Sequence, residues 1–423
     1  MISSTPLPER AEVLVVGAGL AGLSSALLLE REGVDVHVVE EADAVGGRVR
    51  TDVMDGFLLD RGFQVLLTAY EEVQSQVDLL DLDLQAFMPG SMIWNESGLQ
   101  RMSDPFRDPA GAFASMGARV GTLSDKMKVA SLRKRLLSRS ADACFDGPER
   151  STLEELRALG FTEDFIDSFF RSFLGGVFLE RGLETSASLF RYYFRCFAAG
   201  DATLPSGGMQ ALPELLATAL DGRITLDAAA AEVRADGVTL QDGRRVVAED
   251  VIVAVDGAAA SRLLGTPTPS FKATVTSYFA TPEPPTSERM LVLDGEGTGP
   301  ANHVAVMSLV APSYAPDGMH LVSVNGVDDA ADDVDAFVEA VPAQMRRWFG
   351  DTVDQWTHLR SYHIPHALPK HPAGTLSAER EPRRADGLVI AGDYTDFGAI
   401  QGALRSGRRA ADSVITRRKE RDA

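Results

Sequence analysis

The residues with the clearest chemical implication are three glycines and one glutamate near the N-terminus. An apolar run at residues 13–16 leads into Gly17-x-Gly19-x-x-Gly22, and Glu40 follows 18 residues after the last glycine. In this spacing Gly17 permits a tight turn, Gly19 lets a pyrophosphate approach the backbone, and Gly22 lets a helix pack on a strand. Glu40 is then placed to accept a hydrogen bond from a ribose hydroxyl, and it disfavours a 2′-phosphate there. The pattern predicts a dinucleotide-binding site.

The elements that position these residues can also be predicted. Residues 13–16 are typical of a buried parallel strand, residues 20–31 of an Ala/Leu-rich helix, and residues 34–39 of a second strand that ends at the acid. Ala18 and Ala21 lie in the turn and at the helix start, where backbone amides and the helix N-terminus favour a phosphate. We therefore expect a βαβ unit whose first turn, these alanines included, contacts the dinucleotide.

Two further segments indicate which dinucleotide this is. Gly46, Gly47 and Arg48 follow directly after the acid and can surround a pyrophosphate or a flavin with backbone and a guanidinium. A bare NAD domain does not need them. Near the other end of the chain, an apolar strand at residues 388–391 runs into Gly392-Asp393, and a helix begins at about residue 399.

GAGLAG at residues 17–22, Glu40, GGRVRT at residues 46–51 and the Gly392-Asp393 segment together resemble the flavin-containing amine oxidoreductase superfamily, and the resemblance spans the whole chain. This superfamily includes amine oxidases, protoporphyrinogen oxidases and phytoene-desaturase-like enzymes. The resemblance implies FAD as the cofactor. It also implies that Asp393 meets the ribityl or phosphate part of FAD and that the helix carrying Gln401 and Ala403 points its N-terminus at the flavin. The strand backbone at Val233 would meet the adenine; the alternative is that Val233 is an ordinary buried core residue.

The fold class expected is α/β, with an α+β substrate part. Dinucleotide-type strand and helix signals recur in three separated pieces, so we predict a Rossmann-like FAD-binding domain formed by residues 1–85, 203–265 and 384–423. A discontinuous substrate domain, residues 86–202 and 266–383, is inserted twice. Residues 104–200 are predicted to be largely helical.

Composition narrows the function classes. The chain has 423 residues, is 45% hydrophobic and carries a net charge of −20, which makes nucleic acid a poor partner. Neither a secretory signal nor a run of 18 apolar residues is evident, so a cytoplasmic protein is expected. Cys144 and Cys196 form no CxxC motif and lie outside the C-terminal FAD segment, which indicates non-covalent FAD. No metal site is predicted, although His363, His366 and His371 cluster.

The sequence assigns no catalytic residue, because flavin performs the hydride chemistry. Gln64 and Arg61 follow Asp60 in a segment similar to the superfamily's strand near the isoalloxazine; the alternative is a buried Asp60 paired with Arg61. Tyr362 and His363 are candidates for the substrate cavity, or else for packing of a proline-rich strand. Amine oxidases usually present a lysine near the flavin, and Lys272 is a poor match for it.

Two segments bear on the substrate. Residues 161–197 are rich in aromatic side chains, which pack a helical core or line an apolar channel. Residues 125–140 are predicted to form an amphipathic helix with six cationic side chains and one acidic side chain. The cationic face of this helix is either exposed to solvent or a surface that binds an anionic membrane.

We therefore expect an FAD-dependent oxidoreductase that desaturates a hydrophobic small molecule by hydride transfer to flavin N5 and is reoxidised by oxygen or a quinone. The basic helix at residues 125–140 would allow peripheral contact with a membrane, unless it is only a solvated face. The alternatives are a flavin amine oxidase and a non-redox FAD-dependent isomerase or FAD-stabilised binding protein. The sequence leaves the substrate and the oligomeric state open.

Overall fold

A mainly parallel sheet carries the N-terminal glycine motif. The computed structural model describes residues 4–376 and 381–422. Strands β10, β2, β1 and β13 run parallel in that order, β19 lies parallel beside the end of β13, and β12 and β11 extend the sheet antiparallel. The strands are β1 (Arg10–Val16), β2 (Val36–Val39), β10 (Ile224–Thr225), β11 (Ala230–Arg234), β12 (Gly237–Leu240), β13 (Arg245–Val253) and β19 (Val389–Ile390).

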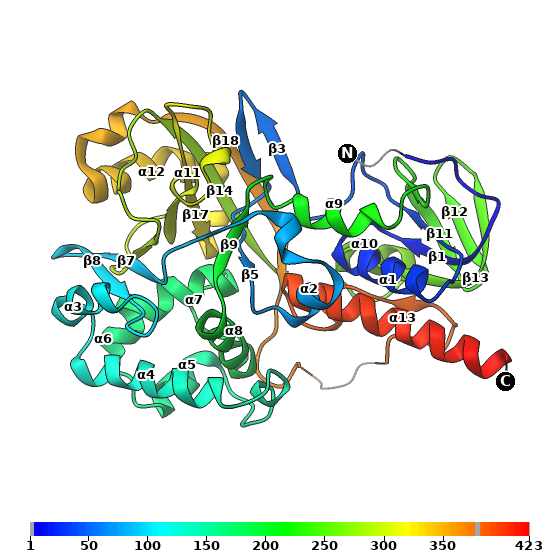
Figure 1. The fold of residues 1–423 in the computed structure, drawn as a ribbon, viewed down its shortest axis with the longest axis horizontal. Helices are drawn as coiled ribbons and strands as arrows, with labels where there is room; N and C mark the ends of the chain where they lie inside the picture. The colour runs from blue at the N-terminus through cyan, green and yellow to red at the C-terminus, as the bar shows by residue number, and fades with distance from the viewer. Residues whose placement is uncertain (1–3, 377–380, 423) are drawn as a thin grey trace.

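Helices from the two ends of the chain pack together against this sheet (Figure 1). Helix α1 (Leu20–Arg31) has the predicted bounds and leaves β1 through the glycine turn, and α13 (Ile400–Asp422) lies along it. The Ser24 hydroxyl donates a hydrogen bond to the carbonyl of Leu404 at 2.9 Å. At Gly407 a Cβ atom would lie 2.2 Å from the carbonyl oxygen of Ala21. The close contact of these helices joins the predicted first and last cofactor segments.

The second large sheet is antiparallel apart from one pair. Its order is β18–β14–β17–β16–β15–β7–β8, in which only β15 and β7 run parallel. Helix α12 (Val334–Phe349) packs on it, and the rings of Trp94 and Trp348 stack 6.3 Å apart. The strands are β7 (Gly90–Asn95), β8 (Gly98–Ser103), β14 (Phe271–Thr281), β15 (Leu291–Asp294), β16 (His303–Val306), β17 (His320–Val327) and β18 (Thr357–Pro369).

A layer of helices lies on the other side of the antiparallel sheet from α12 in Figure 1. It confirms the largely helical prediction for residues 104–200. Its members are α3 (Pro109–Gly117), α4 (Leu123–Leu137), α5 (Thr152–Ala158), α6 (Glu163–Phe165), the π-helical turn η3 (Ile166–Phe170), α7 (Arg171–Phe178) and α8 (Ala187–Ala199). The other helices are α2 (Glu71–Gln76), α9 (Ala211–Thr218), α10 (Gly257–Leu264) and α11 (Met307–Val310). Among the described helices, none combines the length and the apolar character needed to cross a bilayer.

Short strands and turns connect the two halves of the molecule. Strands β3 (Thr51–Met54) and β4 (Phe57–Asp60) form a hairpin, and β5 (Leu66–Leu67), β9 (Ala202–Pro205) and β6 (Leu84–Ala86) form a small sheet. The 3₁₀ turns are η1 (Leu79–Leu82), η2 (Asp142–Cys144), η4 (Pro312–Tyr314), η5 (Asp328–Ala331), η6 (Gly350–Gln355) and η7 (Asp393–Thr395).

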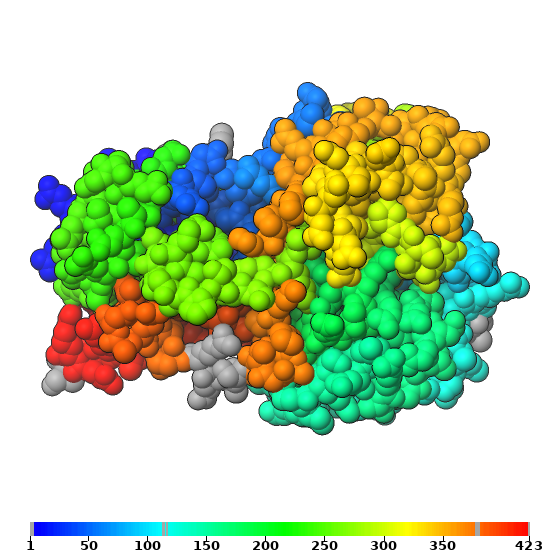
Figure 2. All heavy atoms as spheres, turned by 180° about the vertical axis from the view of Figure 1, so that it is seen from behind, coloured from blue at the N-terminus to red at the C-terminus, as the bar shows by residue number. Residues whose placement is uncertain are grey.

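The strands of the two large sheets come from different stretches of the chain. All strands of the parallel sheet lie within residues 1–85, 203–265 and 384–423, and all strands of the antiparallel sheet lie within 86–202 and 266–383. Figure 2 shows the first set gathered at one end of the molecule, and the antiparallel sheet with the helical layer at the other. This distribution supports the predicted domain division, whose bounds stay a prediction.

Candidate functional site

The turn between β1 and α1 has the backbone that the glycine spacing requires. Gly17 has φ +104°, and a Cβ there would lie 2.8 Å from the carbonyl oxygen of Ala254. A Cβ at Gly22 would lie 1.9 Å from the carbonyl oxygen of Gly17, so the helix can approach the turn only with glycine at this position. At Gly19 nothing lies within 4 Å of an added Cβ, and this residue lines a large cavity. The open side of the turn is therefore available to a ligand that contacts backbone.

Glu40 lies at the end of β2, beside the same turn. One carboxylate oxygen accepts a hydrogen bond from the amide of Ala18 at 2.5 Å, and the other accepts from the amide of Ala42 at 3.0 Å. Burial raises the pKa of Glu40, although both amide hydrogen bonds favour its ionised form. Glu40 also lines the cavity. Because each carboxylate oxygen can accept more than one hydrogen bond, a ribose hydroxyl can be added to these two amides.

The second glycine pair lies against the first turn. The amide of Gly46 donates to the carbonyl of Ala18 at 2.9 Å, and Gly19 and Gly46 form an isolated parallel bridge. Gly47 has φ +59° and lies so close that an added Cβ would be 3.3 Å from the Cα of Gly19. The two glycine motifs therefore form one wall of the cavity.

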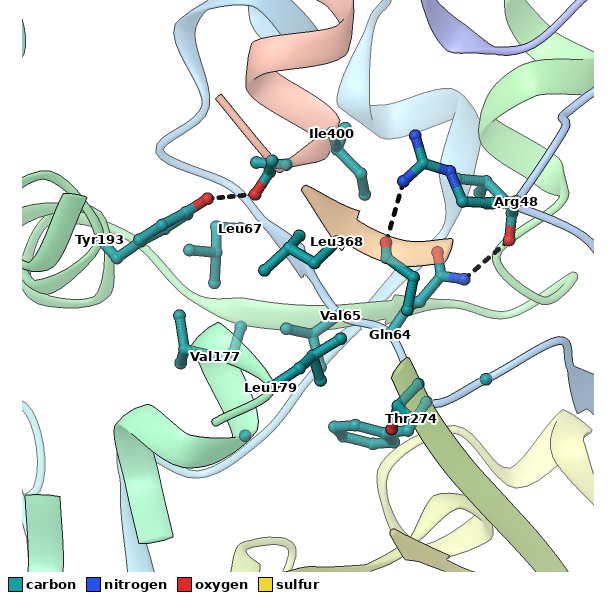
Figure 3. A pocket seen from close by; sticks show the side chains of 18 of the residues that line it. Arg48, Gln64, Val65, Leu67, Val177, Leu179, Tyr193, Thr274, Leu368 and Ile400 are labelled. Atoms are coloured by element: carbon teal, nitrogen blue, oxygen red, sulfur yellow. Dashed lines mark hydrogen bonds between the residues drawn. The ribbon is translucent and has the colours of Figure 1, made fainter. Parts of the chain in front are cut away.

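Arg48, which Figure 3 shows beside Gln64, forms an ion pair with Asp393 in the cavity wall. The distance from Nη2 of Arg48 to Oδ1 of Asp393 is 2.6 Å, and Nη1 of Arg48 donates to the carbonyl of Ala367 at 2.9 Å. The Asp393 side chain is 5% exposed. Burial works against the charged guanidinium, but the carboxylate of Asp393 outweighs it and raises the pKa of Arg48. The sequence pointed to each residue as a cofactor contact but did not predict that they pair with each other.

A single cavity of about 1120 Å³ brings most of the predicted cofactor residues together. From the predicted set, its walls include Gly17, Gly19, Ala21, Glu40, Gly47, Arg48, Gly392, Asp393 and Ala403. Gly392 has φ +149° and directly precedes the buried carboxylate. Ala18 and Gly22 are buried behind the turn and do not line the cavity.

Two predicted cofactor residues lie away from the cavity. Val233, in β11, is 8% exposed and packs in the core of the parallel sheet; its segment contributes Ala228 and Ala230 to the cavity instead. The amide of Ala228 donates to the carbonyl of Glu40 at 2.8 Å, which places this segment beside the end of β2. Gln401 is also buried, and its carboxamide oxygen accepts from the amide of Glu72 at 3.0 Å. In this structure Gln401 joins α13 to α2.

Gln64 lies between the glycine-lined part of the cavity and its apolar part. Its Nε2 donates to the carbonyl of Arg48 at 2.9 Å and to that of Arg61 at 3.4 Å, which fixes the orientation of the carboxamide. In Figure 3 this side chain lies next to Arg48, with aliphatic side chains beyond it. The labelled aliphatic residues are Val65, Leu67, Val177, Leu179, Leu368 and Ile400.

The aromatic segment divides between the core and the cavity. Phe169 and Phe173 stack with ring centroids 5.4 Å apart, and Phe173 packs against Phe197 at 5.2 Å. These three line the cavity, whereas Phe170 and Phe190 are fully buried in the core. Some aromatic residues of this segment therefore pack in the core, as one prediction had it, and others line an apolar cavity, as the alternative had it. Tyr193 lines the cavity as well, and its hydroxyl donates to the carbonyl of Gly398 at 2.5 Å.

Tyr362 and His363 do not line the cavity. The Tyr362 hydroxyl donates to the carboxylate of Asp52 at 2.7 Å, burial raises the pKa of Tyr362 to about 12, and His363 is exposed. Their strand, β18, reaches the cavity through residues 364–368 instead. The pairing of β18 with β14 is irregular here, because Thr274 pairs with Ile364 and Lys272 with Leu368. Such a bulge redirects side chains in a way that strand alternation does not predict.

The expected alternative pair of Asp60 with Arg61 is absent. Arg61 pairs with Asp52, with Nη2 and Oδ1 2.9 Å apart. Asp60 is fully buried and accepts hydrogen bonds from the Thr51 hydroxyl, the Met209 amide and the Tyr314 hydroxyl, at 2.6, 3.0 and 2.9 Å. Burial raises the pKa of Asp60 to about 6. Asp60 therefore joins several segments next to the site.

Lys272 is not part of the site. Its ammonium group lies 3.0 Å from the carboxylate of Glu180 and donates to the Thr185 hydroxyl at 2.7 Å. Burial lowers its pKa. Among the described residues that line the cavity, the only lysine is Lys126, which lies in α4. The structure therefore gives no support to a lysine from the Lys272 segment near a flavin.

Several cavity residues were not predicted from the sequence. Phe63, Thr274 and His303 line the cavity from the side of the antiparallel sheet, and the rings of Phe63 and His303 meet edge to face at 5.0 Å. Burial lowers the pKa of His303 to about 3, so its imidazole is neutral at physiological pH. Phe63 lies in the predicted segment of Asp60 and Gln64 but was not itself singled out, and no local motif marks Thr274 or His303, which tertiary packing brings to the cavity.

The two cysteines lie away from the cavity. Cys144 and Cys196 are buried, neither forms a disulfide, and burial raises the pKa of both thiols, that of Cys196 to about 12. Neither thiol lines the cavity. The described residues also include no group of three or more His, Cys, Asp or Glu side chains arranged to hold a metal ion.

Comparison with known proteins agrees with the family resemblance found in the sequence. A family model described as flavin containing amine oxidoreductase matches residues 20–415. Protoporphyrinogen oxidase 2 of Arabidopsis thaliana is 27% identical over 165 residues, which cover 39% of this chain and 32% of that protein. Hydroxyneurosporene desaturase of Rubrivivax gelatinosus is 52% identical over 50 residues, which cover 12% of this chain and 10% of that protein. The chain thus aligns with a third or less of the length of these curated relatives.

The fold is similar to that of solved structures along nearly its whole length. A double mutant of putrescine oxidase superposes with a TM-score of 0.73 and 19% sequence identity, and the match covers 96% of this chain and 99% of that chain. The fold therefore agrees with the predicted class.

Proposed function

We propose, from the premise that the chain belongs to the flavin-containing amine oxidoreductase family, that this FAD-dependent oxidoreductase desaturates an apolar small molecule. The observation that carries the proposal is the continuous cavity that joins the glycine-lined wall to the aromatic helices. FAD, when bound, supplies the acceptor for a hydride at flavin N5. The protein has to hold the cofactor, orient the substrate and exclude water.

The glycine-lined part of the cavity fits FAD. Gly19 leaves open space where a side chain would block a pyrophosphate, and the α1 N-terminus is directed at it. Glu40 has remaining acceptor capacity for a ribose hydroxyl. Arg48 and Asp393 offer a charge pair at the start of the apolar part. Since neither cysteine lines the cavity, we propose that FAD is bound non-covalently.

The apolar part of the cavity favours an uncharged substrate over an amine. An amine is a cation at neutral pH, and burying it in an apolar cavity is unfavourable unless an unengaged carboxylate replaces its hydration. The carboxylates among the described cavity residues are otherwise engaged: Asp393 pairs with Arg48, Asp104 with Arg133 at 3.4 Å, and Asp256 caps α10. Glu40 and Glu41 lie in the glycine-lined part, next to the first turn.

Anaerobic reduction of the bound flavin tests the proposal. The purified protein is mixed without oxygen with an apolar polyene, a porphyrinogen or a set of primary amines, and flavin absorbance is followed. We expect an apolar compound to bleach the flavin and the amines to leave it oxidised. Reoxidation is then started with air or with a quinone, the two acceptors that we propose.

Two results would contradict this function. Bleaching by an amine alone would identify an amine oxidase. Conversion of an apolar compound only after the flavin has been chemically reduced, with no net oxidation, would identify an isomerase. We also propose a cytoplasmic location, which the two free cysteines support.

A further inference from the structure

Exposed apolar side chains are concentrated at one end of the cavity. Phe106, Leu123 and Met127 line the cavity and are 57%, 66% and 65% exposed, so the cavity opens to the outside between them. We call these three residues the opening rim. They are half of the six large hydrophobic side chains exposed among the described residues. Single exposed apolar residues are ordinary on a protein surface, whereas a group around one opening marks an interaction site.

Internal packing does not explain the exposure of the rim on α4. The helix begins with a capping box between Thr122 and Asp125, and its buried stripe is formed by Leu132 and Leu136. Leu123 and Met127 are one turn apart on another face. The helix is therefore held by its cap and buried stripe, and the rim residues remain free to contact something else.

The rim lies beside the basic part of an otherwise acidic protein. Helix α4 carries five cations, Lys126, Lys128, Arg133, Lys134 and Arg135, while the whole chain has a net charge of −20. Lys134 and Arg135 are exposed, and neither has an ion-pair partner among the described residues. The guanidinium of Arg133 lies 4.6 Å from the ring centroid of Phe106, which places a cation directly over the rim.

We propose that the opening rim docks on an anionic phospholipid bilayer. Phe106, Leu123 and Met127 enter the boundary between headgroups and acyl chains, and Lys134 and Arg135 lie at the lipid phosphates. The acidic remainder of the chain is repelled by the same surface, so only this end faces the membrane. The inference rests on the proposed function in one respect: an apolar substrate would pass from the bilayer into the cavity without crossing water.

Vesicle sedimentation tests the docking surface directly. The full-length FAD-loaded protein is mixed with vesicles of phosphatidylcholine alone or of phosphatidylcholine with phosphatidylglycerol, and the bound fraction is measured. We expect binding to the anionic vesicles only. The double substitution Lys134→Glu and Arg135→Glu lies outside the cavity lining and should weaken this binding at least about tenfold. Phe106→Ser should weaken it by a similar factor through loss of the inserted ring.

A matched control separates local docking from total charge. Arg244→Glu and Arg245→Glu change the net charge equally, on exposed residues at the β12–β13 hairpin, which lies at the opposite end of the molecule in Figure 1. This variant should bind as the wild type does. Three results would overturn the proposal: equal loss of binding in both double variants, equal binding to both kinds of vesicle, or no binding to either. The absence of binding would favour an acidic protein as the partner. Because no substrate is added, the outcome does not depend on which compound reduces the flavin.

Discussion

At the scale of single residues, Glu40 combines a structural and a binding role. Its carboxylate accepts from the amides of Ala18 and Ala42 and also faces the cavity. We expect Glu40→Ala to weaken FAD binding by about 1–3 kcal/mol, because a charge-assisted hydrogen bond to the ribose is lost. Fluorescence titration of the apo-protein with FAD measures this. Glu32→Ala, on an exposed residue at the end of α1, is the control. An unchanged dissociation constant for Glu40→Ala would show that this carboxylate does not contact the ribose.

The pair of Arg48 and Asp393 is suited to a double-mutant cycle. Asp393→Ala should reduce FAD retention without unfolding the chain, and Arg48→Ala should also cost stability, because it leaves a buried carboxylate without its partner. Since the two side chains are in contact, their effects on FAD affinity should be non-additive by about 0.5–3 kcal/mol. The FAD dissociation constant and the melting temperature of the apo-protein are measured for the wild type, both single variants and the double variant. Additive effects on affinity, with losses confined to apo-protein stability, would limit the pair to a structural role.

At the scale of secondary-structure elements, Asp60 joins β4 to β3, to the entry of α9 and to η4 through three hydrogen bonds. Its folded-state pKa of about 6 lies above the value of about 3.9 in an unfolded chain. Folding therefore favours the protonated carboxyl, and this contribution to the free energy of unfolding is lost as pH rises through about 6. When the pH is raised from about 5.5 to about 8, the free energy of unfolding of the wild type should fall by about 1 kcal/mol relative to that of Asp60→Asn. Denaturant unfolding at both pH values tests this, and a constant difference would contradict it.

At the scale of the whole molecule, the cavity walls come from both large sheets and from the helical layer. A ligand in the glycine-lined part contacts segments from both ends of the chain and should stabilise them together. At a free FAD concentration 100-fold above its dissociation constant, the free energy of unfolding should rise by about 2.7 kcal/mol. Denaturant titration with FAD, and with NAD at the same concentration, measures the effect. Stabilisation by NAD but not by FAD would contradict the cofactor assignment.

The sequence by itself determined the local units of this protein. The spacing of Gly17, Gly19 and Gly22 specifies a strand–turn–helix unit, because each glycine meets a steric requirement within a few residues, and α1 has the bounds that its pattern predicted. The resemblance of the motifs at both ends of the chain identified the family and, with it, the fold. Periodicity likewise predicted the helical character of residues 104–200.

The tertiary structure alone decided which distant residues meet. Arg48 and Asp393, 345 positions apart, pair because α1 and α13 pack on one sheet, and no local pattern encodes that contact. The irregular pairing in β18 brings residues 364–368 to the cavity in place of Tyr362 and His363, and Arg61 turns to Asp52 in place of Asp60. Short-range sterics and periodicity act within one element, whereas side-chain partners depend on register and on packing between elements, which only the complete fold specifies.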